Sequence, residues 1–399
     1  MQELEQAVEL LLSSVSPVTE TELVPLDAAL GRVLAEDCIA PQDYPPFPRS
    51  PLDGYAVRGA DTAGASRETP VSLRVIGKIF AGEVFSGTVG PGEAVRIMTG
   101  APIPEGADTV VRQEDTDYGT EVVSLYSSVS PCQNYCPAGE YYKTGDRLLK
   151  KGCYLNAIAV RSLAELGLDR VQVYELPRIA VISTGDEVTE PGVPLAPGKI
   201  YDSNRFFLTN LLTELGCAPV ESLHCGDDAE LLAGEIRRLS ERCQLILTTG
   251  GVSVGEKDIL HRTVELLGAQ TLFWKVAVKP GSPTLAAKYQ NTLLLCLSGN
   301  PNGAAVHFEL LARPVLAKLT GSPLWGVKRR RAVLSEGYPK GSKMRRLLRG
   351  TVDGHRVHLA RGDADKGVMT ALVESNCLVE LPPRPDGFPS GTEVWVYCL

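Results

Sequence analysis

The chain lacks the features that mark secreted, membrane-spanning and nucleic-acid-binding proteins. No stretch approaches the roughly 20 consecutive apolar residues of a membrane helix. The ten cysteines include no CxxC pair and no His/Cys spacing typical of a metal site. A formal net charge of -8 argues against a surface for nucleic acid or anionic membrane. These absences predict a reduced cytoplasmic setting and a local pocket for any anionic ligand.

The residues that are present suffice for several hydrophobic cores. The 399 residues are 44% hydrophobic and 22% charged, with 39 glycines and 28 prolines. A chain of this length predicts about two to four domains. The first 12 residues are acidic and carry apolar residues at helical spacing, so we expect an amphipathic helix there rather than a signal peptide.

The pattern along the chain predicts a multidomain α/β protein. Residues 1–40 and 141–175 form one discontinuous α+β support domain in this interpretation. Residues 41–140 contain short β-runs and predict an inserted β-rich domain. Residues 176–322 alternate strands with helices, which is typical of a three-layer α/β domain. Residues 323–399 are β-patterned and predict a C-terminal barrel-like domain.

Two shorter segments also carry predictions. A helix is expected near residues 26–34, with Asp27 as its N-cap. The basic run KRRRAVL, residues 328–334, is interpreted as a solvated linker in preference to a binding patch.

Polar clusters follow most strands expected in the α/β region. In such folds, ligands bind beyond the carboxyl ends of the strands, so these clusters should share one edge and form a pocket. The clusters cover residues 183–187, 201–204, 226–228, 248–255 and 298–301.

The segment LILTTGGVSVG, residues 245–255, reads as a buried strand entering a glycine-rich turn. Paired glycines let backbone N–H groups approach a phosphate, and Thr249 and Ser253 add hydroxyl donors. The motif is neither a P-loop nor GxGxxG, which disfavours ordinary nucleotide hydrolysis. A plain tight turn is the alternative, so the motif alone does not show that the segment binds phosphate.

Charged residues near the same edge suit a multiply charged ligand. Lys275 and Lys279 flank a short strand, and the second lies in a stiff KPGSP turn. Glu187, Asp227 and Asp258 are oxygen ligands suited to Mg²⁺. The alternatives are surface lysines, and carboxylates that act as helix caps.

The inserted region contains two strings rich in proline and glycine, PPFPRSPLDGYA at 45–56 and RIMTGAPIP at 96–104. Rigid loops alone would account for their composition. Asp53 and Thr99, however, are placed where such loops present one polar side chain each, and a proline-held loop orients a group at little entropic cost.

These strings, in this order, closely resemble the molybdopterin molybdenumtransferase family, represented by bacterial MoeA and the gephyrin E domain. The resemblance covers essentially the whole chain, with the motifs SPLDGYAVR, RIMTGAPIPEGADTVV, ISTGDEV, GKIYDSN, TTGGVSVGEKD, KVAVKPGSP and SGNP. It implies an elongated four-domain subunit in a homodimer, with the site between the α/β domain of one subunit and the inserted domain of its partner.

The resemblance also implies a reaction. Molybdenum from molybdate is inserted into adenylylated molybdopterin, and AMP is released with Mg²⁺ support. An upstream adenylyltransferase or a molybdenum enzyme is an expected protein partner. The implied catalytic residues are Asp53, Thr99, Glu187, Asp227 and Asp258, and the last three are also the implied metal ligands. The implied ligand-binding residues are Thr249, Gly250, Gly251, Ser253, Gly255, Lys275, Lys279, Pro280, Gly281, Ser298, Gly299, Asn300 and Pro301.

Three departures from the family pattern bear on the site. Tyr141 stands at an acidic position, Ser282 replaces the second lysine of KPGKP, and Gly303 stands where a serine is usual. The last two predict a weaker or differently tuned site for molybdate. All three departures favour one alternative, a non-catalytic pterin-binding carrier or scaffold. A further alternative is an enzyme that handles another oxyanion or a modified cofactor.

Overall fold

The computed structural model describes residues 1–252, 259–360 and 373–399. The predicted site residues Ser253, Gly255 and Asp258 therefore lie outside the described residues. The chain divides into two compact units. The larger unit comprises Met1–Val24, Gly31–Ala35 and Gln172–Leu399, and the smaller unit comprises Pro25–Leu30 and Glu36–Val171.

The smaller unit is built around a five-stranded sheet with the order β6-β3-β5-β4-β7. Strand β3 is buried along its whole length, so apolar side chains cover both faces of the sheet. This sheet is the β-rich region expected from the sequence. The unit's elements are η1 (Leu26–Ala28), β2 (Cys38–Ile39), β3 (Gly54–Val57), η2 (Gly59–Thr62), β4 (Val71–Ile79), β5 (Glu93–Ile97), β6 (Thr109–Arg112), η3 (Gln113–Asp115), β7 (Val122–Leu125), β8 (Arg147–Leu149) and α2 (Ala157–Glu165).

The prediction of a helix near residues 26–34 is wrong, because only the short 3₁₀ turn η1 forms there. After a turn at residues 30–31, the chain pairs with the strand β9 (Arg170–Tyr174): Ala35 N–H donates to Gln172 O, and Tyr174 N–H donates to Val33 O, both at 2.9 Å. Backbone pairing with a distant segment thus replaces helical hydrogen bonds. Strand β9 also pairs with β1 (Thr21–Pro25).

The larger unit contains a six-stranded sheet with the order β13-β10-β14-β18-β17-β15. The first four strands are parallel, and β17 and β15 are antiparallel to their neighbours. Strands β10, β14 and β18 are buried throughout, as expected for a sheet covered on both faces. The strands are β10 (Ile179–Thr184), β13 (Glu221–Cys225), β14 (Leu245–Thr249), β15 (Gln270–Trp274), β17 (Leu285–Tyr289) and β18 (Thr292–Leu297).

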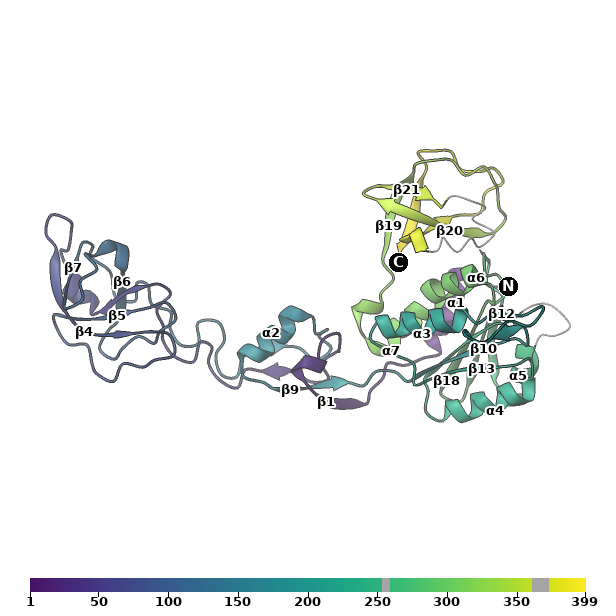
Figure 1. The fold of residues 1–399 in the computed structure, drawn as a ribbon, viewed down its shortest axis with the longest axis horizontal. Coiled ribbons are helices and arrows are strands. Elements are labelled where there is room, and N and C mark those ends of the chain that lie inside the picture. Colours follow the sequence, from purple (N-terminus) through teal and green to yellow (C-terminus); the bar gives the residue numbers. More distant parts are fainter. Residues whose placement is uncertain (253–258, 361–372) are drawn as a thin grey trace. The chain divides into compact units, whose positions relative to one another are not determined.

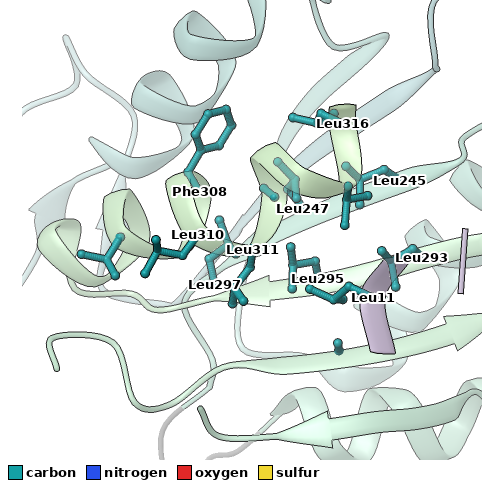
Figure 2. Close-up of a cluster of buried hydrophobic side chains, with 14 of the residues drawn as sticks. Leu11, Leu245, Leu247, Leu293, Leu295, Leu297, Phe308, Leu310, Leu311 and Leu316 are labelled. Atoms are coloured by element: carbon teal, nitrogen blue, oxygen red, sulfur yellow. The ribbon is translucent and has the colours of Figure 1, made fainter. Parts of the chain in front are cut away.

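Helices cover both faces of this sheet (Figure 1). One core joins the sheet to α1, α3 and the last helices, and Figure 2 shows Leu11 of α1 among the leucines of β14 and β18. The opposite core joins the sheet to α4 and α5. The remaining elements here are α1 (Leu4–Ser13), β11 (Val188–Thr189), β12 (Ile200–Tyr201), α3 (Asn204–Glu214), α4 (Ala229–Ser240), α5 (Ile259–Leu267), α6 (Pro301–His307), the π-helical η4 (Phe308–Ala312), α7 (Arg313–Thr320) and η5 (Pro323–Trp325).

The C-terminal strands form a closed barrel. The order is β16-β20-β21-β19-β23-β22, and an added β20–β22 pairing closes five strands into a ring. The predicted barrel-like C-terminal domain is therefore confirmed. Its strands are β19 (Arg329–Leu334), β20 (Arg345–Asp353), β21 (Arg356–Leu359), β22 (Cys377–Leu381) and β23 (Glu393–Cys398), and β16 (Val278–Lys279) lies at the edge of β20.

Two sequence-based assignments differ from this arrangement in detail. The run at 328–334 is not a linker: Arg329–Leu334 is strand β19, and Arg329 and Arg331 stack on Trp395 of β23. Helix α1 packs into the α/β core through Leu4 and Leu11, although the sequence places residues 1–40 in the support domain. The predicted domain boundaries otherwise remain a prediction. None of the described helices has the length and apolar character needed to cross a bilayer.

Candidate functional site

The carboxyl ends of the parallel strands lie in line at one edge of the large sheet. Ser183 of β10 is in register with Thr249 of β14, and Thr249 is in register with Leu297 of β18. Thr184 is likewise in register with Cys225 of β13. The polar clusters that follow these strands therefore start from the same edge, which is where an α/β sheet binds ligands.

The glycine turn after β14 is fixed by its backbone shape. Gly250 has φ +95°, and a Cβ there would lie 2.5 Å from the carbonyl oxygen of Thr184. Only glycine fits this position without displacing β10. Thr249 is buried, and its hydroxyl donates to the Ser298 carbonyl at 3.1 Å. The turn after β14 is thereby joined to the loop after β18.

Asn204 connects three of the polar clusters. Its Nδ2 donates to the Thr249 hydroxyl at 2.9 Å and to the Gly299 carbonyl at 2.8 Å. Glu187, Gly250 and Pro301 line a cavity together with Asn204 and Thr249. Sequence reasoning singled out the cluster at 201–204 but gave Asn204 no role, because its two acceptors are more than 40 residues away in sequence.

A hydrogen-bond network centred on the buried residues Ser183 and Asp202 holds the neighbouring loop. The Ser183 hydroxyl donates to Asp202, and its oxygen lies 3.1 Å from Nδ1 of His224. Because that hydroxyl gives its one proton to Asp202, His224 is the donor in the second bond. Arg205 Nε donates to the same carboxylate at 2.8 Å. The network fixes the start of α3, and with it Asn204.

Two of the predicted carboxylates, Glu187 and Asp227, lie on adjoining turns. Asp186 Oδ1 accepts a hydrogen bond from the Asp227 N–H at 3.0 Å, which joins the turn after β10 to the turn after β13. Glu187 lines the cavity, and its carboxylate lies over Gly185. Asp228 is a helix cap, accepting from the N–H groups of Glu230 and Leu231. Of the carboxylates near this edge, Asp228 is therefore one that caps a helix, which was the alternative to metal binding.

Metal binding by protein groups alone is not supported within residues 1–252, 259–360 and 373–399, where no three His, Cys, Asp or Glu side chains form a metal cluster. Mg²⁺ commonly takes one or two carboxylates and completes its shell with ligand phosphate and water. Glu187 lines the cavity and Asp227 lies on the adjoining turn, so two carboxylates would be available to an ion whose further oxygens came from the substrate.

The predicted lysines differ in their surroundings. The Lys275 ammonium lies 4.0 Å from the ring centroid of Trp274, a cation–π contact. Lys279 is exposed and belongs to β16. The turn that follows it packs against α6, since a Cβ on Gly281 would lie 3.2 Å from Cα of Gly303. The KPGSP turn and the SGNP loop are thus neighbours.

The loop after β18 begins helix α6 with an asparagine cap. Asn300 Oδ1 accepts from the N–H groups of Asn302 at 3.0 Å and Gly303 at 3.2 Å. Pro301 occupies the first helical turn, where its missing N–H costs nothing. Ser298 N–H donates to Nδ1 of the buried His307 at 3.1 Å. The loop is therefore held at both ends.

One basic residue of the barrel was missed from sequence. Arg349 of β20 lines a cavity with Asn204 and Pro301. It is partly buried, and the desolvation lowers the pKa of its guanidinium. Its Nε has no hydrogen-bond partner within the described part of the chain. The sequence gave little signal, because Arg349 is one of several arginines in a β-patterned tail.

In the smaller unit, the two predicted site residues are hydrogen-bonded to each other. Asp53 Oδ1 accepts from both the N–H and the hydroxyl of Thr99, each at 2.7 Å. These bonds stabilise the carboxylate and lower the pKa of Asp53. Tyr141 is 57% exposed, and the guanidinium of Arg49 lies 5.9 Å from its ring centroid.

Comparison with known proteins identifies the family. Residues 2–167 match the MoeA N-terminal region (domain I and II), residues 180–318 a probable molybdopterin binding domain, and residues 331–399 the MoeA C-terminal region (domain IV).

Individual relatives and a solved structure are similar to this chain over most of its length. The chain is 38% identical to a molybdopterin molybdenumtransferase of Bacillus subtilis, over 95% of this chain and 90% of the relative. It is 40% identical to one from Haemophilus influenzae, over 81% and 78%. A crystal structure of a molybdopterin biosynthesis MoeA protein from Pyrococcus horikoshii matches with a TM-score of 0.84 and 31% identity, covering 99% of this chain and 98% of that one. The chain belongs to the MoeA family, the molybdopterin molybdenumtransferases of molybdenum cofactor biosynthesis.

Proposed function

We propose that this enzyme inserts molybdenum from molybdate into adenylylated molybdopterin and releases AMP, acting as a homodimer with Mg²⁺. The observation that carries the proposal is the shared sheet edge, where Asn204 joins the glycine turn after β14 to the loop after β18. A phosphate-bearing ligand suits this edge, because it offers backbone N–H groups close to a glycine turn.

The carboxylates supply the acidic side of the proposed site. Glu187 and Asp227 would hold Mg²⁺, with Asp258 as a further ligand carried over from the family motif. When bound, the ion would lower the charge on the pyrophosphate as a water or molybdate oxygen attacks phosphorus. Asp186 joins the two turns that carry Glu187 and Asp227, so both carboxylates would be available to the same ion.

The molybdate side is proposed to use Lys279 and the loops beside it. The Lys279 ammonium attracts the oxyanion, while the KPGSP turn and the SGNP loop form the wall behind it. Ser282 and Gly303 remain the positions where this site departs from the family pattern. Asp53 and Thr99 are proposed to act in the homodimer, and an upstream adenylyltransferase or a molybdenum enzyme is the proposed protein partner. A reduced cytoplasmic setting is proposed because all ten cysteines are free thiols.

The test is incubation of the full chain with adenylylated molybdopterin, Mg²⁺ and molybdate, followed by detection of AMP. Molybdate-dependent AMP release is the expected result, and omission of molybdate or addition of a chelator should suppress it. Binding of the pterin without AMP release would overturn the catalytic proposal and select the carrier alternative, which Tyr141, Ser282 and Gly303 favour.

A further inference from the structure

His307 lies beneath two loops of the proposed molybdate site and contacts both. The residue ends α6 and is fully buried. Its Nδ1 accepts a hydrogen bond from the Ser298 N–H at 3.1 Å. Its Nε2 is hydrogen-bonded to the carbonyl oxygen of Gly281. One side chain therefore links the loop after β18 to the KPGSP turn.

The two partners of His307 determine its protonation. A backbone N–H can only donate and a backbone carbonyl can only accept, so Nδ1 is unprotonated and Nε2 carries the proton. The ring is neutral in this arrangement. Burial favours the same form and lowers the pKa of His307 to about 4. The ring thus acts as a fixed spacer with one acceptor and one donor.

The KPGSP turn and the loop after β18 are closely packed around the His307 ring. A Cβ on Gly281 would lie 2.6 Å from Nε2 of His307. A Cβ on Gly303 would lie 2.8 Å from both Cβ and Oγ of Ser298. Residues 303 and 307 are one helical turn apart and share a face of α6. The small residues permit the close approach, and His307 sets its extent.

We infer that His307 is a positioning residue for the oxyanion substrate, fixing the separation between the Lys279–Gly281 turn and the Ser298–Pro301 loop. The identity of the oxyanion as molybdate rests on the proposed function. This arrangement gives a steric reason for glycine at position 303. The serine usual in the family would place its Cβ 2.8 Å from Ser298 and 3.2 Å from Cα of Gly281, so restoring that hydroxyl alone would press against both loops.

Three substitutions separate the two hydrogen bonds. His307→Asn keeps an acceptor near the position of Nδ1, His307→Gln keeps a donor near the position of Nε2, and His307→Ala removes both. We expect His307→Ala to raise the KM for molybdate about 10-fold while kcat changes less than about twofold, because a displaced loop weakens binding more than chemistry. Asn or Gln should restore part of the affinity.

A matched control comes from β18, the strand that leads into the Ser298 loop, at the end far from that loop. Thr292 is buried, and its hydroxyl donates to the Cys243 carbonyl at 2.6 Å. Thr292→Val should lower the melting temperature without changing the KM for molybdate. A loss of fold stability alone therefore cannot account for a KM effect confined to the His307 variants.

The deciding measurements are steady-state AMP release and equilibrium dialysis of molybdate with the full chain. An unchanged molybdate KM in His307→Ala, or an equal rise in Thr292→Val, would overturn the inference. If the wild-type chain releases no AMP, the proposed reaction fails. Dialysis then tests the His307 inference by itself, because weaker molybdate binding by His307→Ala supports a positioning role. A wild-type chain that neither reacts nor binds molybdate overturns both.

Discussion

Asp53 and Thr99 form a two-bond contact in which one carboxylate oxygen accepts both the backbone N–H and the hydroxyl of the threonine. The residues are 46 positions apart in sequence, yet the contact joins the two proline-rich strings of the inserted region. It orients a carboxylate that is otherwise open to solvent and lowers its pKa.

The first prediction concerns this contact. Thr99→Val removes the hydroxyl and keeps the backbone bond, so the pKa of Asp53 should rise towards its ordinary value, as measured by NMR titration. AMP release by Thr99→Val should fall about 10-fold, and that of Asp53→Asn by more, if the oriented carboxylate serves the reaction.

The smaller unit offers a matched control. Asp43 Oδ1 accepts from the N–H of Thr144 at 2.8 Å and from its hydroxyl at 2.7 Å, the same arrangement outside the predicted site. Thr144→Val should raise the pKa of Asp43 and leave AMP release unchanged. Equal effects of Thr99→Val and Thr144→Val on activity would show that the contact is structural in both places.

A second prediction separates a ligand carboxylate from a capping carboxylate. Glu187→Gln should retain pterin binding and reduce AMP release about 100-fold or more, because it removes a negative ligand for Mg²⁺. Asp228→Ala should cost about 1 kcal/mol of stability through loss of the α4 cap and preserve turnover. Unchanged turnover in Glu187→Gln, measured at saturating Mg²⁺, would remove the metal–carboxylate mechanism.

The sequence predicted well those features that depend on local pattern. Buried runs such as residues 245–249 predicted the central strands, and the rule that ligands bind at carboxyl ends placed Glu187, Thr249 and Ser298 near one edge. The β-patterned tail likewise predicted the β-domain at the C-terminal end of the sequence. Each of these inferences needs only neighbouring residues and a known sheet geometry.

Features that depend on distant partners were not predictable. Part of the helix expected at 26–34 is replaced by backbone pairing with β9, and Arg329–Leu334 is a strand because β23 pairs with it. The roles of Asn204 and His307 likewise arise from acceptors that only folding brings near. A sequence pattern cannot specify these contacts, since it carries no information on which loops meet.

A third prediction concerns the glycine turn. Gly250→Ala should cost about 2 kcal/mol or more, because φ is positive and the new Cβ would lie 2.5 Å from the Thr184 carbonyl. A Cβ added at Gly234, within α4, would meet no neighbouring atom of the described residues within 4 Å. Gly234→Ala should therefore raise stability by about 1 kcal/mol. Urea unfolding followed by tryptophan fluorescence checks both, and similar effects would contradict the assigned strain.

The last prediction follows from the buried, neutral His307. An unfolded chain protonates this residue below about pH 6.5, whereas the folded chain resists protonation until about pH 4. Between these values the unfolded state binds more protons, so the free energy of unfolding must fall as the pH falls. The contribution over the interval is about 3 kcal/mol, at roughly 1.4 kcal/mol per pKa unit.

His307→Asn removes the titrating group, so its free energy of unfolding should fall less than that of the wild type between about pH 6.5 and 4. All three tryptophans, Trp274, Trp325 and Trp395, belong to the larger unit, so their fluorescence reports unfolding of the unit that contains His307. Parallel pH profiles for the two proteins would contradict burial of a neutral imidazole, and with it the assignment of Nδ1 as the acceptor for Ser298.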